Sequence, residues 1–137
     1  MKVLLSIKPE YANKILSGEK RFEFRKVSFT NACVKTVVIY ATKPVGKVVG
    51  EFEVLDIYSD SPSKIWEKTK KHAGIDKQFF DSYYEGKRIA VAIAVGEVQR
   101  YKNPIELAEL GGSPIAPQSF RYIEASEGRH QSELELV

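Results

Sequence analysis

The stretch GEKRFEFR, residues 18–25, connects a predicted helix to a predicted strand and holds the densest group of charged side chains in the chain. Gly18 ends the helix, and the phenylalanines that follow alternate with charged residues, as in a strand with two different faces. Glu23 therefore projects to the same side as the arginine before it and the arginine after it, and Lys20 lies at the bend beside them. If this side faces a cleft, the cluster can receive a phosphate, a carboxylate or the polar edge of a base. The alternative is a solvent-exposed ladder of alternating charges.

Outward from this stretch, apolar periodicity predicts a series of short strands and helices. Strands are predicted at residues 3–7, from residue 21 onward, and at 36–41, 47–58 and 88–98, with helices at 9–17, 63–71 and 76–84. A short helix or turn is predicted to begin at residues 103–105. Most strands lie too close in sequence for βαβ crossovers, so we predict a small mixed β-barrel of the α+β class, with helices covering its openings.

The length and composition are those of one folded domain. The chain has 137 residues, of which 43% are hydrophobic and 28% are charged, so it has enough apolar material for a core. This composition excludes disordered, collagen-like and coiled-coil proteins. Residues 124–137 contain few large apolar side chains, and we predict that they form a flexible acidic tail after a domain of residues 1–123.

The lengths of the apolar runs and the few cysteine and histidine residues exclude several kinds of site and location. The longest apolar runs, such as residues 89–95, fall far below the roughly 20 residues that a membrane-spanning helix needs. No signal peptide is predicted, so we expect a cytoplasmic protein without a membrane partner. The single cysteine, Cys33, excludes an internal disulfide, and His72 and His130 form no metal-ligand pair. We therefore predict neither a bound metal nor a cofactor.

Positive charge is concentrated in the first part of the chain. Residues 1–50 carry ten Lys or Arg against three Glu, which gives +7, while residues 51–137 carry eleven against fifteen acidic residues, which gives −4. A clustered cationic face favours a polyanionic partner, because it attracts phosphates and releases their counterions.

The motif at residues 18–25 resembles the signature of the ASCH domain family, Gly-x-Lys-x-x-Glu-x-Arg, with Gly18, Lys20, Glu23 and Arg25 at its four positions. Other phrases are also similar to this family: LSIKPEYANKIL at 5–16, YATKP at 40–44, VVGEFEV at 48–54 and PQSFRYI at 117–123. The resemblance covers residues 2–123. It implies a PUA-like β-barrel with a cleft beside it, lined by the signature, that binds RNA or a nucleotide-like ligand.

This resemblance and the residue types together predict the ligand-binding residues, which are Lys8, Lys20, Glu23, Arg25, Gln118, Ser119 and Arg121. Lys20 and Arg25 are expected to neutralise phosphate or to bind carbonyl edges. Glu23 is expected to accept from an exocyclic amine or to orient an arginine, while the polar residues at 118–121 close the far wall. The predicted function is RNA or nucleotide-ligand binding with a regulatory role in RNA metabolism, translation or transcription.

Two alternatives remain at this point, and the sequence predicts no oligomeric state. The ASCH family includes amidohydrolases that deacetylate N4-acetylcytidine with a lysine, a threonine and a glutamate. Lys20 would then be catalytic together with Glu23, but Glu23 occupies the threonine position, and Asp76 is the nearest acidic candidate for the glutamate. The other alternative is a protein-interaction module of a transcriptional regulator.

Overall fold

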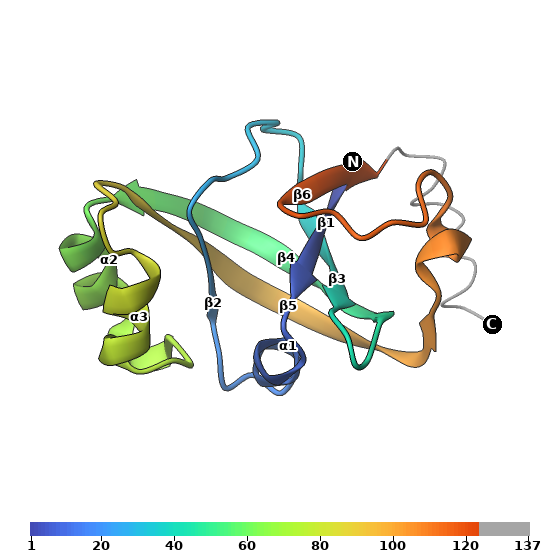
Figure 1. The fold of residues 1–137 in the computed structure, drawn as a ribbon, viewed down its shortest axis with the longest axis horizontal. Helices are drawn as coiled ribbons and strands as arrows, with labels where there is room; N and C mark the ends of the chain where they lie inside the picture. Colours follow the sequence, from blue (N-terminus) through green and yellow to red (C-terminus); the bar gives the residue numbers. More distant parts are fainter. Residues whose placement is uncertain (124–137) are drawn as a thin grey trace.

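The computed structural model describes residues 1–123 of the chain, and these residues form one mixed sheet with helices packed against it (Figure 1). The strands are β1 (Lys2–Ile7), β2 (Phe22–Arg25), β3 (Thr36–Ala41), β4 (Lys47–Asp60), β5 (Ala90–Ile105) and β6 (Phe120–Ile123). The α-helices are α1 (Pro9–Leu16), α2 (Pro62–Thr69) and α3 (Lys77–Tyr83), and the 3₁₀ helices are η1 (Lys70–His72) and η2 (Leu107–Leu110).

The sheet has the strand order β2-β5-β4-β3-β1-β6. β1 runs parallel to β3, and the other neighbouring strands are antiparallel. The long strands β4 and β5 pair across the molecule (Figure 1), and their register shifts at three points, such as between Phe52 and Val54. Such irregularities bend a strand pair and increase its twist. The mixed α+β fold is therefore confirmed, but β2 and β6 remain two separate edges, so the sheet is not closed into a barrel.

Apolar spacing places each helix against the sheet. In α1, Ala12, Ile15 and Leu16 are buried against the sheet, as the three- and four-residue spacing predicts. The helices α2 and α3 lie together at one end of the molecule (Figure 1), where Ile65 and Phe80 pack against Phe24 and the first residues of β5. The candidate site lies between α1 and this second helical layer. None of the described helices has both the length and the apolar character that a membrane crossing requires.

The short helix predicted to begin at residues 103–105 is present but begins later, as η2 (Leu107–Leu110), because residues 103–105 are the end of β5. Pro104 is tolerated there since β2 pairs only with residues 91–94 of β5, which leaves one side of this strand end without a neighbour. The short strand β6 was not predicted, because four residues are too few for a clear alternation. The predicted acidic tail lies outside the described residues.

Candidate functional site

A cavity of about 200 Å³ opens between α1, β2 and α3. Its walls combine charged side chains from the first part of the chain with aromatic side chains from both helices. The charged lining residues are Lys8, Lys20, Glu23 and Arg25, the aromatic ones are Tyr11, Phe24, Phe79 and Tyr83, and the others are Ser6, Ile7 and Ile75.

Lys20 is the most deeply buried cation of this cavity, with only 2% of its surface exposed. Its Nζ donates a hydrogen bond to the Ala73 carbonyl at 2.6 Å and lies 4.6 Å from the centre of the Phe24 ring. Burial lowers the pKa of Lys20 to about 8, although the Glu23 carboxylate opposes this by favouring the charged form. An ammonium has three N–H donors, so two remain for a ligand.

Two glycines determine where Lys20 points. Gly18, with φ of +87°, ends α1, and the next turn is held by a hydrogen bond of 2.9 Å from the Lys20 N–H to the Lys14 carbonyl. Gly74, with φ of +71°, lies directly against the aliphatic stem of Lys20. A Cβ at this position would come within 2.6 Å of Lys20 Cβ and Cγ, so the side chain has its present path only because residue 74 has no side chain.

Glu23 and Arg25 form the second charged group in the cavity. Glu23 is 6% exposed, and burial raises the pKa of its carboxyl, while Arg25 and Lys20 act in the opposite direction. The Glu23 Oε2 and Arg25 Nη1 atoms are 3.3 Å apart. The guanidinium also donates to the Ser6 carbonyl at 3.3 Å and to the Ser119 carbonyl at 2.6 Å. Arg25 therefore connects β2, one edge of the sheet, with β1 and with the residue that precedes β6 at the other edge.

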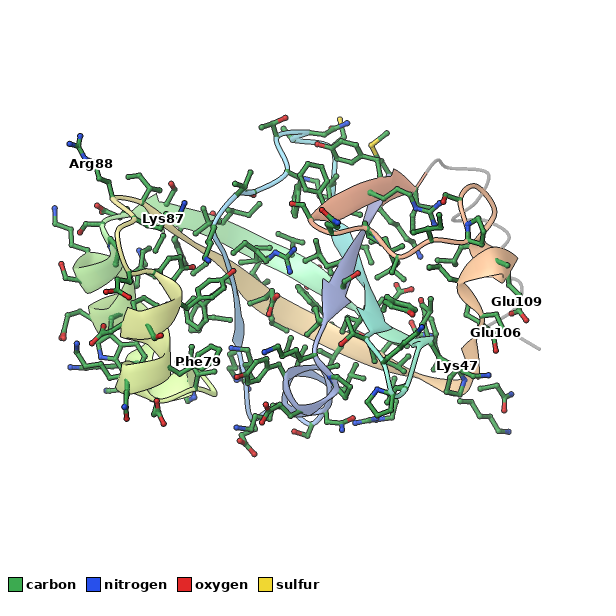
Figure 2. The ribbon with its side chains drawn as sticks, in the orientation of Figure 1. Lys47, Phe79, Lys87, Arg88, Glu106 and Glu109 are labelled. Carbon is green, nitrogen blue, oxygen red and sulfur yellow. The ribbon has the colours of Figure 1, made fainter. Side chains whose placement is uncertain are left out.

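The aromatic wall is built mainly by α3. Asp76 begins this helix by accepting a hydrogen bond of 2.8 Å from the Phe79 N–H. Phe79 lies between α3 and α1 (Figure 2), and its ring is 5.7 Å from that of Tyr11 in an edge-to-face arrangement. The rings of Phe79 and Tyr83 are nearly parallel, with an angle of 10° between their planes. Phe79 remains 38% exposed, so part of its ring is accessible to solvent and to a ligand.

The structure brings four of the seven predicted ligand-binding residues together, namely Lys8, Lys20, Glu23 and Arg25. The exposed Gln118 does not line the cavity, and Ser119 contributes only its carbonyl, as the acceptor for Arg25. Arg121 instead donates to the carbonyls of Gly111 and Ser113, in the loop before β6. Their predicted ligand contacts stay predictions.

The far wall of the cavity was expected to consist of the polar residues at 118–121, but it is formed by Phe79 and Tyr83. The apolar spacing within residues 76–84 predicts instead that Phe79, Phe80 and Tyr83 lie on the buried side of a helix. The signal that could have revealed this is the number of aromatic residues in residues 79–84. A short helix buries only one stripe of side chains, and Phe80 and Tyr84 already fill that stripe, so the other two rings face the cavity. Asp76 does not line the cavity, and within residues 1–123 no cluster of His, Cys, Asp or Glu is arranged to hold a metal ion.

Three comparisons with known proteins agree on the family. Residues 5–108 match the sequence model of the ASCH domain. A large ribosomal subunit protein of Ureaplasma parvum is 34% identical over 122 residues, which is 88% of this chain but 39% of that protein, so the chain spans well under half the length of this curated relative. An ASCH domain-containing ribonuclease of Zymomonas mobilis is 29% identical over 126 residues, covering 90% of this chain and 85% of the relative.

Solved structures show the same fold. The crystal structure of a serine-to-alanine variant of ZmASCH from Zymomonas mobilis superposes with a TM-score of 0.89 at 28% identity, covering 97% of this chain and 95% of that one. The N-terminal domain of McrB from Staphylothermus marinus shares the fold, with a TM-score of 0.57 at 11% identity, covering 96% of this chain and 93% of that one.

Proposed function

Because the chain belongs to the ASCH domain family, we propose that it binds single-stranded RNA and takes one nucleotide into the cavity between α1, β2 and α3. One observation carries this proposal: the buried Lys20, the buried Glu23 and the half-buried Arg25 share a single cavity with several aromatic rings. An unpaired nucleotide offers the matching groups, which are a charged phosphate, a polar base edge and two flat faces.

Each wall has a role in this proposal. Phe79 and Tyr83 offer ring faces on which a base stacks, and such stacking contributes about 1–3 kcal/mol per base. Lys20 has two free N–H donors for a carbonyl oxygen of the base or a phosphate oxygen. Glu23 accepts a hydrogen bond from an exocyclic amine, and Lys8, exposed at the edge of the cavity, is positioned for the phosphate.

The choice of RNA rests on the relative from Zymomonas mobilis, which is named a ribonuclease. That relative matches this chain over most of both lengths, so the likeness is not confined to one motif. The excess of positive charge in residues 1–50 supports the same class of ligand.

A second candidate function is cleavage of the bound RNA, which the name of this relative and the pKa of Lys20 favour. With a pKa of about 8, roughly one tenth of Lys20 is neutral at pH 7. The neutral amine would take the proton of a ribose 2′-hydroxyl as its oxygen bonds to the adjacent phosphorus. The P–O5′ bond would break, and the Lys20 ammonium formed in the first step would return its proton to the leaving oxygen. The products are a 2′,3′-cyclic phosphate and a free 5′-hydroxyl.

Binding is tested by fluorescence anisotropy with a labelled single-stranded hexanucleotide. We expect Lys20→Met and Phe79→Ala each to weaken the affinity about tenfold or more, which corresponds to about 1.4 kcal/mol. The matched controls are Lys102→Met and Leu55→Ala, which change an exposed lysine and an exposed apolar residue outside the cavity. Equal affinity in the cavity variants and the controls would contradict the proposal.

Cleavage is tested on the same hexanucleotide by separating the products on a denaturing gel. We expect a fragment that ends in a cyclic phosphate, and we expect it to disappear with Lys20→Met. Intact RNA after long incubation with the wild-type protein would rule out cleavage and leave the binding proposal standing.

The alternatives drawn from the sequence stay predictions. They are deacetylation of N4-acetylcytidine, followed as release of cytidine by chromatography, and a protein-interaction role in a transcriptional regulator. The cytoplasmic location and the regulatory role are likewise predictions.

A further inference from the structure

A group of cations lies where β2 ends and β5 begins, outside the lining of the cavity. Arg25, the last residue of β2, pairs with Val91 of β5 in antiparallel register. The residue after Arg25 is Lys26, and the residues just before β5 include Lys87 and Arg88. We call Lys26, Lys87 and Arg88 the cationic corner.

This corner is held in place by a buried tyrosine. The hydroxyl of Tyr84, at the end of α3, lies 2.9 Å from the Arg25 carbonyl and 3.1 Å from the Val91 carbonyl. Tyr84 is only 3% exposed, so it joins the helix to both strands inside the protein. The three cations therefore project from a fixed framework.

The charges of the corner have no acidic partners among the described residues. All three side chains are exposed, and Figure 2 shows Lys87 and Arg88 at the end of the molecule where α2 and α3 lie. Among the residues that the structure describes, none of the three forms an ion pair with an acidic side chain.

The corner is continuous with the cavity. Lys26 Nζ lies 4.7 Å from the centre of the Tyr83 ring, and Tyr83 lines the cavity. Two apolar side chains also belong to this surface: Val27 is 65% exposed and Ile89 is 50% exposed. A lysine face that is only solvated has no need of exposed apolar neighbours, whereas a single strand presents both phosphates and bases to the surface that binds it.

We propose that the cationic corner binds the phosphates next to the nucleotide held in the cavity, so that the natural ligand is a single-stranded RNA segment and not a free nucleotide. This inference rests on the proposed function. The strand leaves the cavity past Tyr83 and Lys26 and continues along the end of β2 to Lys87 and Arg88. Charge complementarity selects RNA as the occupant, because these cations have no carboxylate partners in the described chain.

The test compares a mononucleotide with a hexanucleotide that contains it, on the wild type and on the double variant Lys87→Gln, Arg88→Gln. We expect the double variant to bind the hexanucleotide about tenfold or more weakly than the wild type. The slope of log affinity against log salt concentration should be shallower by about 1.4, since each phosphate contact to a single strand contributes about 0.7 to this slope. Mononucleotide affinity, measured by calorimetry, remains unchanged.

The matched control is Arg100→Gln, Lys102→Gln, which removes the same two charges from exposed residues near the other end of β5. Equal hexanucleotide affinity and salt slope in the two double variants would overturn the corner proposal, as would equal binding of mononucleotide and hexanucleotide by the wild type. In either case, mononucleotide binding that depends on Lys20 preserves the proposed function. Failure of the wild type to bind either ligand overturns both proposals.

Discussion

At the scale of single residues, the buried ammonium of Lys20 makes ligand binding depend on pH. Its pKa is lowered to about 8, so the side chain loses its charge as the pH rises through that value. The neutral amine no longer attracts phosphate, and affinity should therefore fall above about pH 8, with a midpoint raised somewhat by the bound anion. The measurement is the affinity for an oligocytidine from about pH 6 to about pH 10.

Lys20→Arg is the matched variant for this prediction. Its guanidinium stays charged throughout the same range, since the pKa of arginine is above about 12. The fall in affinity above about pH 8 should therefore be absent from this variant, whatever its absolute affinity. Parallel pH profiles for the wild type and Lys20→Arg would show that another group is responsible.

The charged residues of the cavity could be predicted from the sequence better than their hydrogen-bond partners could. Lys20, Glu23 and Arg25 were predicted because they match the ASCH signature, for which the resemblance implies a cleft, and all three line the cavity. Arg21 was expected on the same side of the strand as Glu23 and Arg25. It is exposed, because it lies before β2, which begins at Phe22. The partners of Arg25 were beyond prediction, since the Ser119 carbonyl lies 94 residues away in sequence.

At the scale of elements, the turn between η1 and α3 helps to position the Lys20 side chain, because Gly74 in this turn lies against its aliphatic stem. Gly74→Ala would introduce a Cβ within 2.6 Å of the Lys20 stem, at a backbone conformation with positive φ. We expect the free energy of unfolding to fall by about 1–3 kcal/mol and RNA affinity to fall as well, because the Lys20 side chain must move. Chemical denaturation and anisotropy measure the two effects.

Gly86→Ala separates the clash from the backbone strain. Gly86 has a similar φ of +76°, but its added Cβ would have no atom within 4 Å. This variant should lose stability without losing RNA affinity. If Gly86→Ala lowered affinity as much as Gly74→Ala, contact with Lys20 would not explain the effect.

The elements themselves differ in how well they can be predicted. The helix at residues 9–17 and the strand at 36–41 were predicted almost to the residue, because a terminating Gly18 and a continuous β-branched run leave few choices. The end of β5 was missed because Pro104 usually breaks a strand, and only the absence of a neighbour on one side permits it. That absence is a property of the sheet, not of the local sequence.

At the scale of the whole molecule, one side chain spans the opening between the two edges of the sheet. Arg25 donates to carbonyls of Ser6 and Ser119 and pairs with the buried Glu23. We expect Arg25→Lys to lower the free energy of unfolding by about 1–3 kcal/mol, because a lysine lacks the planar fork that reaches several acceptors at once.

Hydrogen exchange locates this effect. The amides of Phe120–Ile123 in β6 should exchange faster in Arg25→Lys, while those of β4 and β5 at the centre of the sheet change less. Arg100→Lys, an exposed arginine of β5, is the control for the same substitution. Unchanged exchange in β6 would show that the edge is held by its pairing with β1 alone.

The contacts of Arg25 also have a consequence for the order in which the protein is made. Ser6 is synthesised before Arg25, but Ser119 follows it by 94 residues. A chain that is still being translated therefore contains the entire motif of residues 18–25 long before the guanidinium has all of its acceptors. The fully braced cavity forms only after Ser119 has left the ribosome, so a ligand that requires it does not bind a growing chain that is shorter than this.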